Sequence, residues 1–194
     1  MSNIIINNVS KRFGEKTVLS GFSNTFPIGK TTVIMGESGC GKTTLVNIIM
    51  GLEKADRGEI SGVPSHISAV FQDDLLCEDF SAISNIKAVV EKKISKKEIS
   101  DTLLELGLKK EDITRPIREL SGGMKRRVSI ARAIIADSDL VIMDEPFKGL
   151  DTETRQTVIK FILQILQSKT LIIITHSAEE AELLRADKVV DIKQ

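Results

Sequence analysis

Short apolar runs alternate along the chain with longer segments in which apolar residues recur every three or four positions. Five short runs, rich in Val and Ile, lie at residues 32–35, 67–71, 140–143, 171–174 and 189–192. Continuous apolar runs of this length are typical of strands that are covered on both faces, as in parallel sheets. Segments 42–50 and 152–168 repeat Leu, Val and Ile at helical spacing, and Gly51 ends the first of them. The alternation predicts an α/β fold with a mostly parallel central sheet and helices on both faces.

The middle of the chain departs from this alternation. Between residues 73 and 120 no run predicts a strand, and segment 101–108 predicts a helix that ends near Gly107. The charged stretch 91–98 predicts a solvated helix-and-turn surface rather than a binding patch. We therefore expect one domain over residues 1–194, with a nucleotide-binding core at 1–72 and 121–194 and an inserted helical subdomain at 73–120.

Composition narrows the classes of partner. The 27 Lys and Arg balance 27 Asp and Glu, which argues against a nucleic-acid-binding protein, because affinity for a phosphate backbone needs clustered positive charge. Cys40 and Cys77 lie outside any metal-ligand spacing, and we expect free thiols in a reducing cytoplasm. The N-terminus lacks a signal-peptide pattern, and the apolar runs are too short to cross a bilayer. We therefore expect membrane contact only through a partner.

A glycine-rich loop directly after the predicted strand 32–35 is the strongest local signal. It fits G-x-x-x-x-G-K-[ST] and consists of Gly36, Glu37, Ser38, Gly39, Cys40, Gly41, Lys42 and Thr43, with Thr44 next. Such a loop lets backbone N–H groups surround a phosphate at a helix N-terminus. We expect Lys42 to contact the β- and γ-phosphates and Thr43 to hold Mg²⁺. An ordinary glycine-rich turn is the alternative, and the strand–loop–helix context disfavours it.

Two further strand ends carry polar residues. Asp144 and Glu145 follow the run 140–143, and His176 follows 171–174. Because ligands bind beyond the carboxyl ends of parallel strands, we expect these residues beside the glycine-rich loop. Asp144 would help to hold Mg²⁺, and Glu145 would act as general base toward the attacking water. We infer that His176 hydrogen-bonds the γ-phosphate or that water. A polar turn or a structural histidine would explain each residue alone, but their common place favours function.

A second glycine-rich helix start completes the set of motifs. It reads Leu120-Ser121-Gly122-Gly123, in which Ser121 is a natural N-cap and the glycines leave backbone N–H groups uncovered. The helix that follows carries Arg126, Arg127 and Arg132. These arginines could form a nucleic-acid patch, but we expect polar residues at the helix surface and between subunits.

These motifs, in this order, resemble those of the ATP-binding subunits of ABC transporters, and most of all the compact subunits of bacterial importers such as the nitrate, sulfonate and taurine group. The resemblance extends from about residue 4 to 192. It implies a P-loop NTPase fold with a small N-terminal antiparallel β region, ATP and Mg²⁺ as cofactors, and an ATPase that drives solute movement through transmembrane permease subunits. It also implies an ATP-dependent dimer with a second ATP-binding subunit, expected to be a homodimer, on the cytoplasmic face of the membrane.

The resemblance assigns roles to residues that would otherwise be unremarkable. Phe13 matches the aromatic position that stacks on adenine, and Gln72 matches the glutamine that touches Mg²⁺ and the water. Ser121, Gly122 and Gly123 match the signature motif, which contacts the γ-phosphate of ATP held by the other subunit. Asp151 matches the loop that crosses the dimer interface. We expect the permease to dock on the segment after Gln72, with Asp73, Asp74, Leu75, Leu76 and Phe80.

The chain also departs from the family pattern. The crossing loop reads Phe147-Lys148-Gly149-Leu150-Asp151, where family members more often carry Ser-Ala before Leu-Asp. The short stretch between the phosphate loop and Gln72 predicts a trimmed β subdomain, and the few residues after His176 predict no C-terminal regulatory domain.

Three other classes stay open as alternatives: a soluble ABC ATPase that moves no solute, a P-loop kinase or GTPase, and a non-catalytic nucleotide-dependent scaffold. The chain has no coiled-coil insertion, no second ATPase domain and no guanine-reading N-K-x-D motif, and it keeps Lys42, Asp144, Glu145 and His176. Neither the solute nor the direction of transport is readable from the sequence.

Overall fold

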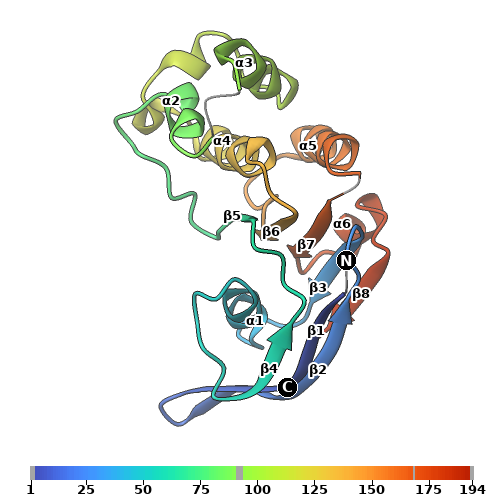
Figure 1. Ribbon diagram of the computed structural model, residues 1–194. Helices are drawn as coiled ribbons and strands as arrows, with labels where there is room; N and C mark the ends of the chain where they lie inside the picture. Colours follow the sequence, from blue (N-terminus) through green and yellow to red (C-terminus); the bar gives the residue numbers. More distant parts are fainter. Residues whose placement is uncertain (1–2, 91–93, 168, 193–194) are drawn as a thin grey trace.

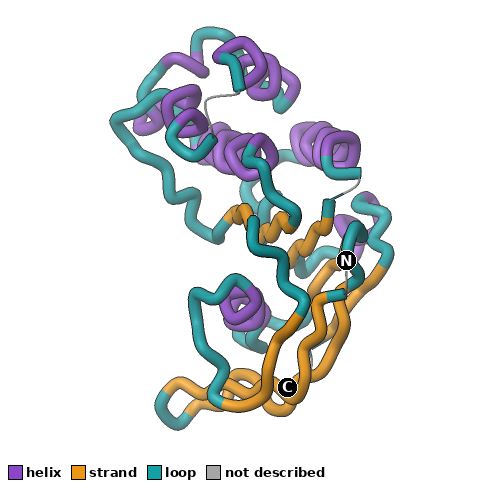
Figure 2. Tube along the Cα trace, in the orientation of Figure 1, coloured by secondary structure: helices purple, strands orange, loops and turns teal. Residues whose placement is uncertain are grey.

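The computed structural model describes residues 3–90, 94–167 and 169–192. The strands are β1 (Ile4–Phe13), β2 (Lys16–Phe26), β3 (Thr31–Met35), β4 (Arg57–Ser61), β5 (Ile67–Val70), β6 (Leu140–Asp144), β7 (Thr170–Ile174) and β8 (Lys188–Asp191). The helices are α1 (Lys42–Ile49), α2 (Ala82–Lys87), α3 (Lys96–Glu105), α4 (Gly122–Ile135), α5 (Thr152–Ile165) and α6 (Ala178–Leu183), with 3₁₀ turns η1 (Asp112–Thr114) and η2 (Ile117–Glu119). Helices α2 to α4 gather at one end, the antiparallel strands lie at the other, and the parallel strands lie between them (Figures 1 and 2).

A five-stranded sheet in the order β5-β6-β7-β3-β8 forms the centre, and each of its pairings is parallel. Strands β6 and β7 are buried at every position, because both faces of the sheet are covered. This explains their unbroken Val, Ile and Leu runs. The predicted α/β fold with a mostly parallel sheet is confirmed.

A three-stranded antiparallel sheet, β2-β1-β4, is the small N-terminal β region that the family resemblance implied. In β1, Ile4, Ile6 and Val9 face inward, and they share an apolar core with α1 and one face of the parallel sheet. Register shifts interrupt the pairing of β1 with both neighbours. Because β1 ends at Phe13, this sheet carries that aromatic side chain toward the edge where the parallel strands end.

Helices α2, α3 and α4 pack against one another above the parallel sheet (Figure 1). Within the described part of segment 73–120 no strand forms, as expected, and the only β-type pairing there is a single bridge between Ser81 and Pro116. One apolar core runs without a break from this layer to the sheet, joining residues such as Leu103 and Val128 to Leu171. The signature helix α4 therefore packs with the inserted helices as much as with the strands.

Two predicted helix boundaries differ from the structure. The helix expected at 101–108 is α3, which begins at Lys96 because Ser95 and Glu98 form a capping box. The helix expected at 152–168 ends at Ile165, where Leu166 leaves the helical conformation. Residues 91–93 of the charged stretch, and the end of that second helix at 168, lie outside the described residues. In the part of the chain that the structure describes, none of the helices has the length and apolar character needed to cross a bilayer.

Candidate active site

The carboxyl ends of β3, β5 and β6 meet at one edge of the sheet and border a pocket of about 420 Å³. Ten residues that the sequence singled out line it: Phe13, Ser38, Gly39, Gly41, Lys42, Thr43, Thr44, Gln72, Asp144 and Glu145. They come from four separate stretches of the chain, and the fold of the two sheets brings them together. Lys16 and Val18, at the start of β2, also line this pocket, and no sequence pattern had pointed to them.

The glycine-rich loop after β3 has the conformation that its sequence predicts. Gly36 has φ +142°, and a Cβ added to it would lie 2.6 Å from the carbonyl oxygen of Ile192. Gly41 has φ +104° and begins α1, so a side chain at either position would be strained and would collide with backbone. The buried ammonium of Lys42 donates hydrogen bonds to the carbonyls of Gly36 (2.8 Å) and Glu37 (2.7 Å). The loop is thus folded around a cation at the N-terminus of a helix, which suits an anionic ligand.

The oxygen-bearing side chains of Thr43 and Asp144 lie together next to this cation. The Thr43 hydroxyl donates to Asp144 Oδ2 over 2.6 Å, although the two residues are 101 positions apart. Asp144 is only 6% exposed. Burial raises the pKa of its carboxyl, against the lowering effect of the Thr43 hydrogen bond. A hydroxyl and a buried carboxylate are hard ligands of the kind that Mg²⁺ prefers, so these residues fit the predicted cation.

Glu145 leaves the strand in the left-handed region, with φ +46°, which is rare for a residue other than glycine. Its N–H donates to the carbonyl of Ile174 over 3.0 Å, so the turn is anchored to β7. Its Oε1 lies 3.7 Å from Nδ1 of His176, and its Oε2 lies 3.5 Å from Nζ of Lys148. Strain of this type, about 1–3 kcal/mol, is typical of functional sites.

His176 lies next to Glu145 but does not line the pocket of about 420 Å³ that holds Lys42 and Asp144. It is exposed and borders a neighbouring pocket of about 680 Å³, together with Gly36, Glu37 and Cys40. The loop 36–43 therefore separates two hollows, and three of its residues face the second one. The expected contact of His176 with a γ-phosphate or water stays a prediction.

Phe13 and Gln72 also line the pocket of about 420 Å³, and their expected contacts with adenine, Mg²⁺ and water stay predictions. Phe13 is half exposed, with the Lys11 ammonium 5.1 Å from the centre of its ring. A half-exposed aromatic ring beside a phosphate-type loop can stack on a base. Gln72 is exposed, and its backbone carbonyl accepts a hydrogen bond from the Arg126 guanidinium.

The arginines of α4 correct one expectation. Arg126 is not a surface residue but is 7% exposed. Its guanidinium donates to the carbonyls of Phe71 (2.6 Å) and Gln72 and lies 3.3 Å from Asp74 Oδ1. Arg132 donates to the carbonyls of Asp74 (3.0 Å) and Leu75 (2.7 Å). Two arginines of helix α4 thus hold the backbone of the segment after β5. The carbonyls that they bind lie more than fifty residues away in the sequence.

The signature residues lie outside the pocket of their own chain. Ser121 caps α4 by accepting a hydrogen bond from the N–H of Met124, and a Cβ added to Gly123 would lie 3.4 Å from Leu150. Gly122 is exposed, with no atom near the position of an added Cβ. Asp151 caps α5: its carboxylate accepts from the Thr154 N–H over 2.9 Å, which lowers its pKa. The signature residues and the glycine-rich loop therefore lie at separate places on the chain.

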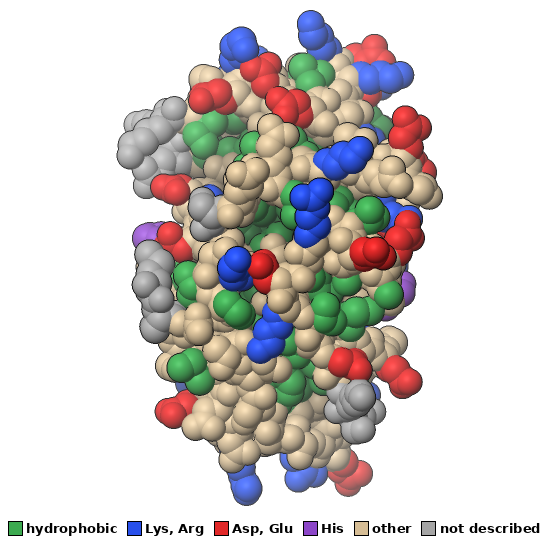
Figure 3. Space-filling model, turned by 90° about the vertical axis from the view of Figure 1, so that its right-hand side faces the viewer, with side chains coloured by type: hydrophobic (Ala, Val, Ile, Leu, Met, Phe, Trp, Pro, Cys, Tyr) green, Lys and Arg blue, Asp and Glu red, His purple; other side chains and the backbone are tan. Residues whose placement is uncertain are grey.

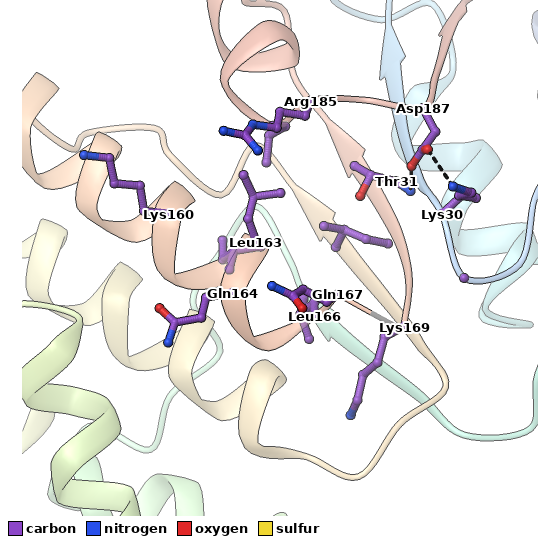
Figure 4. Close-up of a pocket in the computed structure, with 14 residues that line it drawn as sticks. Lys30, Thr31, Lys160, Leu163, Gln164, Leu166, Gln167, Lys169, Arg185 and Asp187 are labelled. Atoms are coloured by element: carbon purple, nitrogen blue, oxygen red, sulfur yellow. Dashed lines mark hydrogen bonds and ion pairs between the residues drawn. The ribbon is translucent and has the colours of Figure 1, made fainter.

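A further pocket, of about 460 Å³, lies where β3 and β7 begin, at the end of the sheet opposite to the glycine-rich loop (Figure 4). Lys30 is paired there with Asp187 at 3.0 Å. Lys160, Lys169 and Arg185 point in different directions in Figure 4 and do not converge on one point. With no glycine-rich loop beside it, this pocket lacks the geometry for a nucleotide phosphate.

Comparison with known proteins points to one family. The family model described as "ABC transporter" matches residues 19–148. The taurine import ATP-binding protein TauB of Roseobacter denitrificans is 36% identical over 95% of this chain and 75% of its own length. The Nod factor export ATP-binding protein I of Burkholderia orbicola is 35% identical over 91% of this chain, which spans only 64% of that relative. A solved dimeric bacterial ABC transporter cassette matches with a TM-score of 0.86 and 25% identity, over 98% of this chain and 94% of that one.

Proposed function

The chain belongs to the ABC transporter family, and from this premise we propose that it binds and hydrolyses ATP as the motor subunit of a transporter. The observation that carries the proposal is a single pocket that gathers the glycine-rich loop, the Thr43–Asp144 pair, Glu145, Gln72 and Phe13. This set combines a phosphate cradle, two cation ligands, a base and an aromatic platform, which are the parts that ATP hydrolysis needs.

In the proposed reaction the backbone N–H groups of the loop and the Lys42 ammonium bind the β- and γ-phosphates. Lys42 already lies in the loop, so it exchanges its two carbonyl partners for phosphate oxygens. Thr43 and Asp144 would hold Mg²⁺, which supplies positive charge against the charge that develops on the phosphate oxygens. Glu145 accepts the proton of the attacking water, and Gln72 and His176 orient that water.

A dimer follows from the separation of the signature motif from the pocket. Ser121, Gly122 and Gly123 do not line the pocket of their own chain, so we infer that they contact the ATP of a second, identical subunit. ATP is then shared by two surfaces, and its binding favours the closed pair over the open one. A solved bacterial ABC transporter cassette of the same fold is dimeric, which supports a dimer of this chain.

We infer that transmembrane permease subunits are the further partners and that the chain meets the cytoplasmic face of the membrane only through them. Leu75 and Phe80 are exposed apolar side chains on the segment after Gln72, which suits a docking surface. Asp74 lies 3.3 Å from the Arg126 guanidinium, and Glu78 and Asp79 pair with Lys125 and Arg118. Asp73 is exposed, and we infer that it is the acidic residue of this segment that serves a partner. Charge reversal at Asp73 should lower permease-stimulated hydrolysis, and unchanged stimulation would contradict the docking surface.

The division into a core at 1–72 and 121–194 and a helical subdomain at 73–120 stays part of this proposal, as does the exclusion of nucleic acid. Figure 3 shows acidic side chains among the basic ones on the face drawn there, which agrees with the zero formal charge.

The relatives are named for taurine import and for Nod factor export. We favour an importer, on the chain's likeness to the taurine import protein.

The test of the core proposal is phosphate release from Mg-ATP by the purified chain, with Lys42→Ala beside the wild type. Loss of the ammonium should lower hydrolysis by at least about a hundredfold, since it removes one of the charges that stabilise the transferring phosphate. The control is Lys97→Gln, which breaks a surface ion pair with Asp101 (2.6 Å) far from the pocket. Equal hydrolysis by wild type and Lys42→Ala would refute the assignment.

A further inference from the structure

Lys148 lies at an unexpected place beside the proposed base. It stands in the crossing loop where family members more often carry a small residue, and its Nζ lies 3.5 Å from Oε2 of Glu145. The other carboxylate oxygen, Oε1, lies 3.7 Å from Nδ1 of His176. Both oxygens of Glu145 therefore face a basic side chain.

The backbone around this contact is held at both ends. The N–H of Lys148 donates to the carbonyl of Glu145 over 3.2 Å, and the N–H of Leu150 donates to the carbonyl of Phe147 over 3.2 Å. Phe147 is buried, and the N–H of Glu145 is bound to Ile174 in β7. The two charged side chains are thus kept near each other by a four-residue turn, which limits the entropy lost when they pair.

We propose that Lys148 makes an autoinhibitory contact with Glu145, which occupies the base and suppresses hydrolysis until the crossing loop moves. The inference rests on the proposed role of Glu145 as general base. Leu150, two residues further along the loop, lies next to Gly123 of the signature motif, where an added Cβ would be 3.4 Å from its side chain. A second subunit that arrives at the signature motif therefore touches the same loop, and its arrival can pull Lys148 away and free the carboxylate.

The expected change in ATPase rate follows from the solvent exposure of the two side chains. The Lys148 side chain is 59% exposed and that of Glu145 is 21% exposed, so water and salt screen the pair. A contact of this kind changes an equilibrium by roughly two- to fivefold. Lys148→Gln should therefore raise the basal ATPase rate of the isolated chain by about that factor at low ionic strength.

Two features separate this charge effect from a structural one. Lys148→Arg keeps the cation and should hydrolyse ATP at the wild-type rate. The gap between wild type and Lys148→Gln should close at about 1 M salt, where charges are screened within a few ångströms. The control is Lys97→Gln, which removes an exposed lysine from an ion pair in α3 and should change nothing. A rate for Lys148→Gln at or below that of wild type, or an Arg variant that behaves like the Gln variant, would overturn the proposal.

An independent measurement needs no nucleotide. The thermal unfolding midpoints of wild type, Glu145→Gln, Lys148→Gln and the double variant form a double-mutant cycle. The proposal expects the two single shifts not to add, because each variant breaks the same pair. Additive shifts would overturn the contact itself. A wild-type chain without ATPase activity would instead refute the proposed function, and the unfolding cycle would still decide on the contact.

Discussion

Replacing Arg126 by methionine should loosen the segment that carries Gln72 to the pocket. The guanidinium donates to the carbonyls of Phe71 and Gln72 and pairs with Asp74, and it is almost completely buried. Methionine has a similar length but no charge and no donor. The variant therefore loses both hydrogen bonds and leaves the Asp74 carboxylate without its cation.

The expected cost can be worked out from these contacts. A hydrogen bond from a charged group contributes about 1.5–3 kcal/mol, and removing one partner of a buried ion pair costs about 3–5 kcal/mol. The Asp74 side chain keeps 22% exposure, so the lower end applies. We expect the free energy of unfolding to fall by about 3 kcal/mol. For a chain of this size that lowers Tm by roughly 6–12 °C.

The assay is thermal and urea unfolding followed by circular dichroism, with Lys125→Met as the matched control. Lys125 is the neighbouring residue on α4 and pairs with Glu78 at 2.9 Å on the surface. A surface pair contributes about 0–1 kcal/mol, so Tm should fall by at most roughly 4 °C. If both variants lower Tm equally, Arg126 does not hold the segment and the reasoning is refuted.

Three further predictions concern single residues. Phe13→Ala should weaken ATP binding about tenfold, because a stacked base is worth about 1–3 kcal/mol, whereas Phe13→Trp should keep the affinity in a fluorescence titration; equal affinities would contradict stacking. Thr43→Val should abolish the gain in nucleotide affinity that Mg²⁺ gives in calorimetry, and Thr43→Ser should keep it; a gain retained by the valine variant would exclude Thr43 as a ligand. The Thr31 N–H, together with Lys30, holds the pKa of Asp187 below its usual value, so its contribution to stability is present above about pH 4 and is lost as pH falls through the folded-state pKa. Asp187→Asn should therefore lower Tm at pH 7 but not near about pH 2, and equal shifts at both pH values would contradict this assignment.

The central sheet and the phosphate loop were predictable from sequence for a physical reason. Strands covered on both faces must be apolar throughout, so β6 and β7 stand out as runs, and the residues at their ends meet at one edge. Strands β1 and β2 were harder to place. Only alternate positions of β1 are buried, and its register shifts interrupt the alternation that would mark it as a strand.

The start of α3 has a signal in the sequence, whereas the contacts of Arg126 and Lys16 have none. The Ser95-x-x-Glu98 capping box stands in the sequence and marks the start of α3. Arg126 gives no such signal, because its partners lie 54 and 55 residues away and are backbone carbonyls. Lys16 also gives no signal, because the pairing of β1 with β2 is what places it at the pocket. Contacts of this kind depend on the folded chain, so the sequence around each residue does not reveal them.

The measurement that tests the central claim most directly is ATP-dependent dimerisation, compared between wild type and Glu145→Gln by sedimentation with Mg-ATP. Removing the base should trap bound ATP between two subunits. The account predicts a monomer without nucleotide and a dimer with ATP that is more abundant in the Glu145→Gln variant. A variant that binds ATP but stays monomeric at every concentration would contradict the claim that two chains share each ATP.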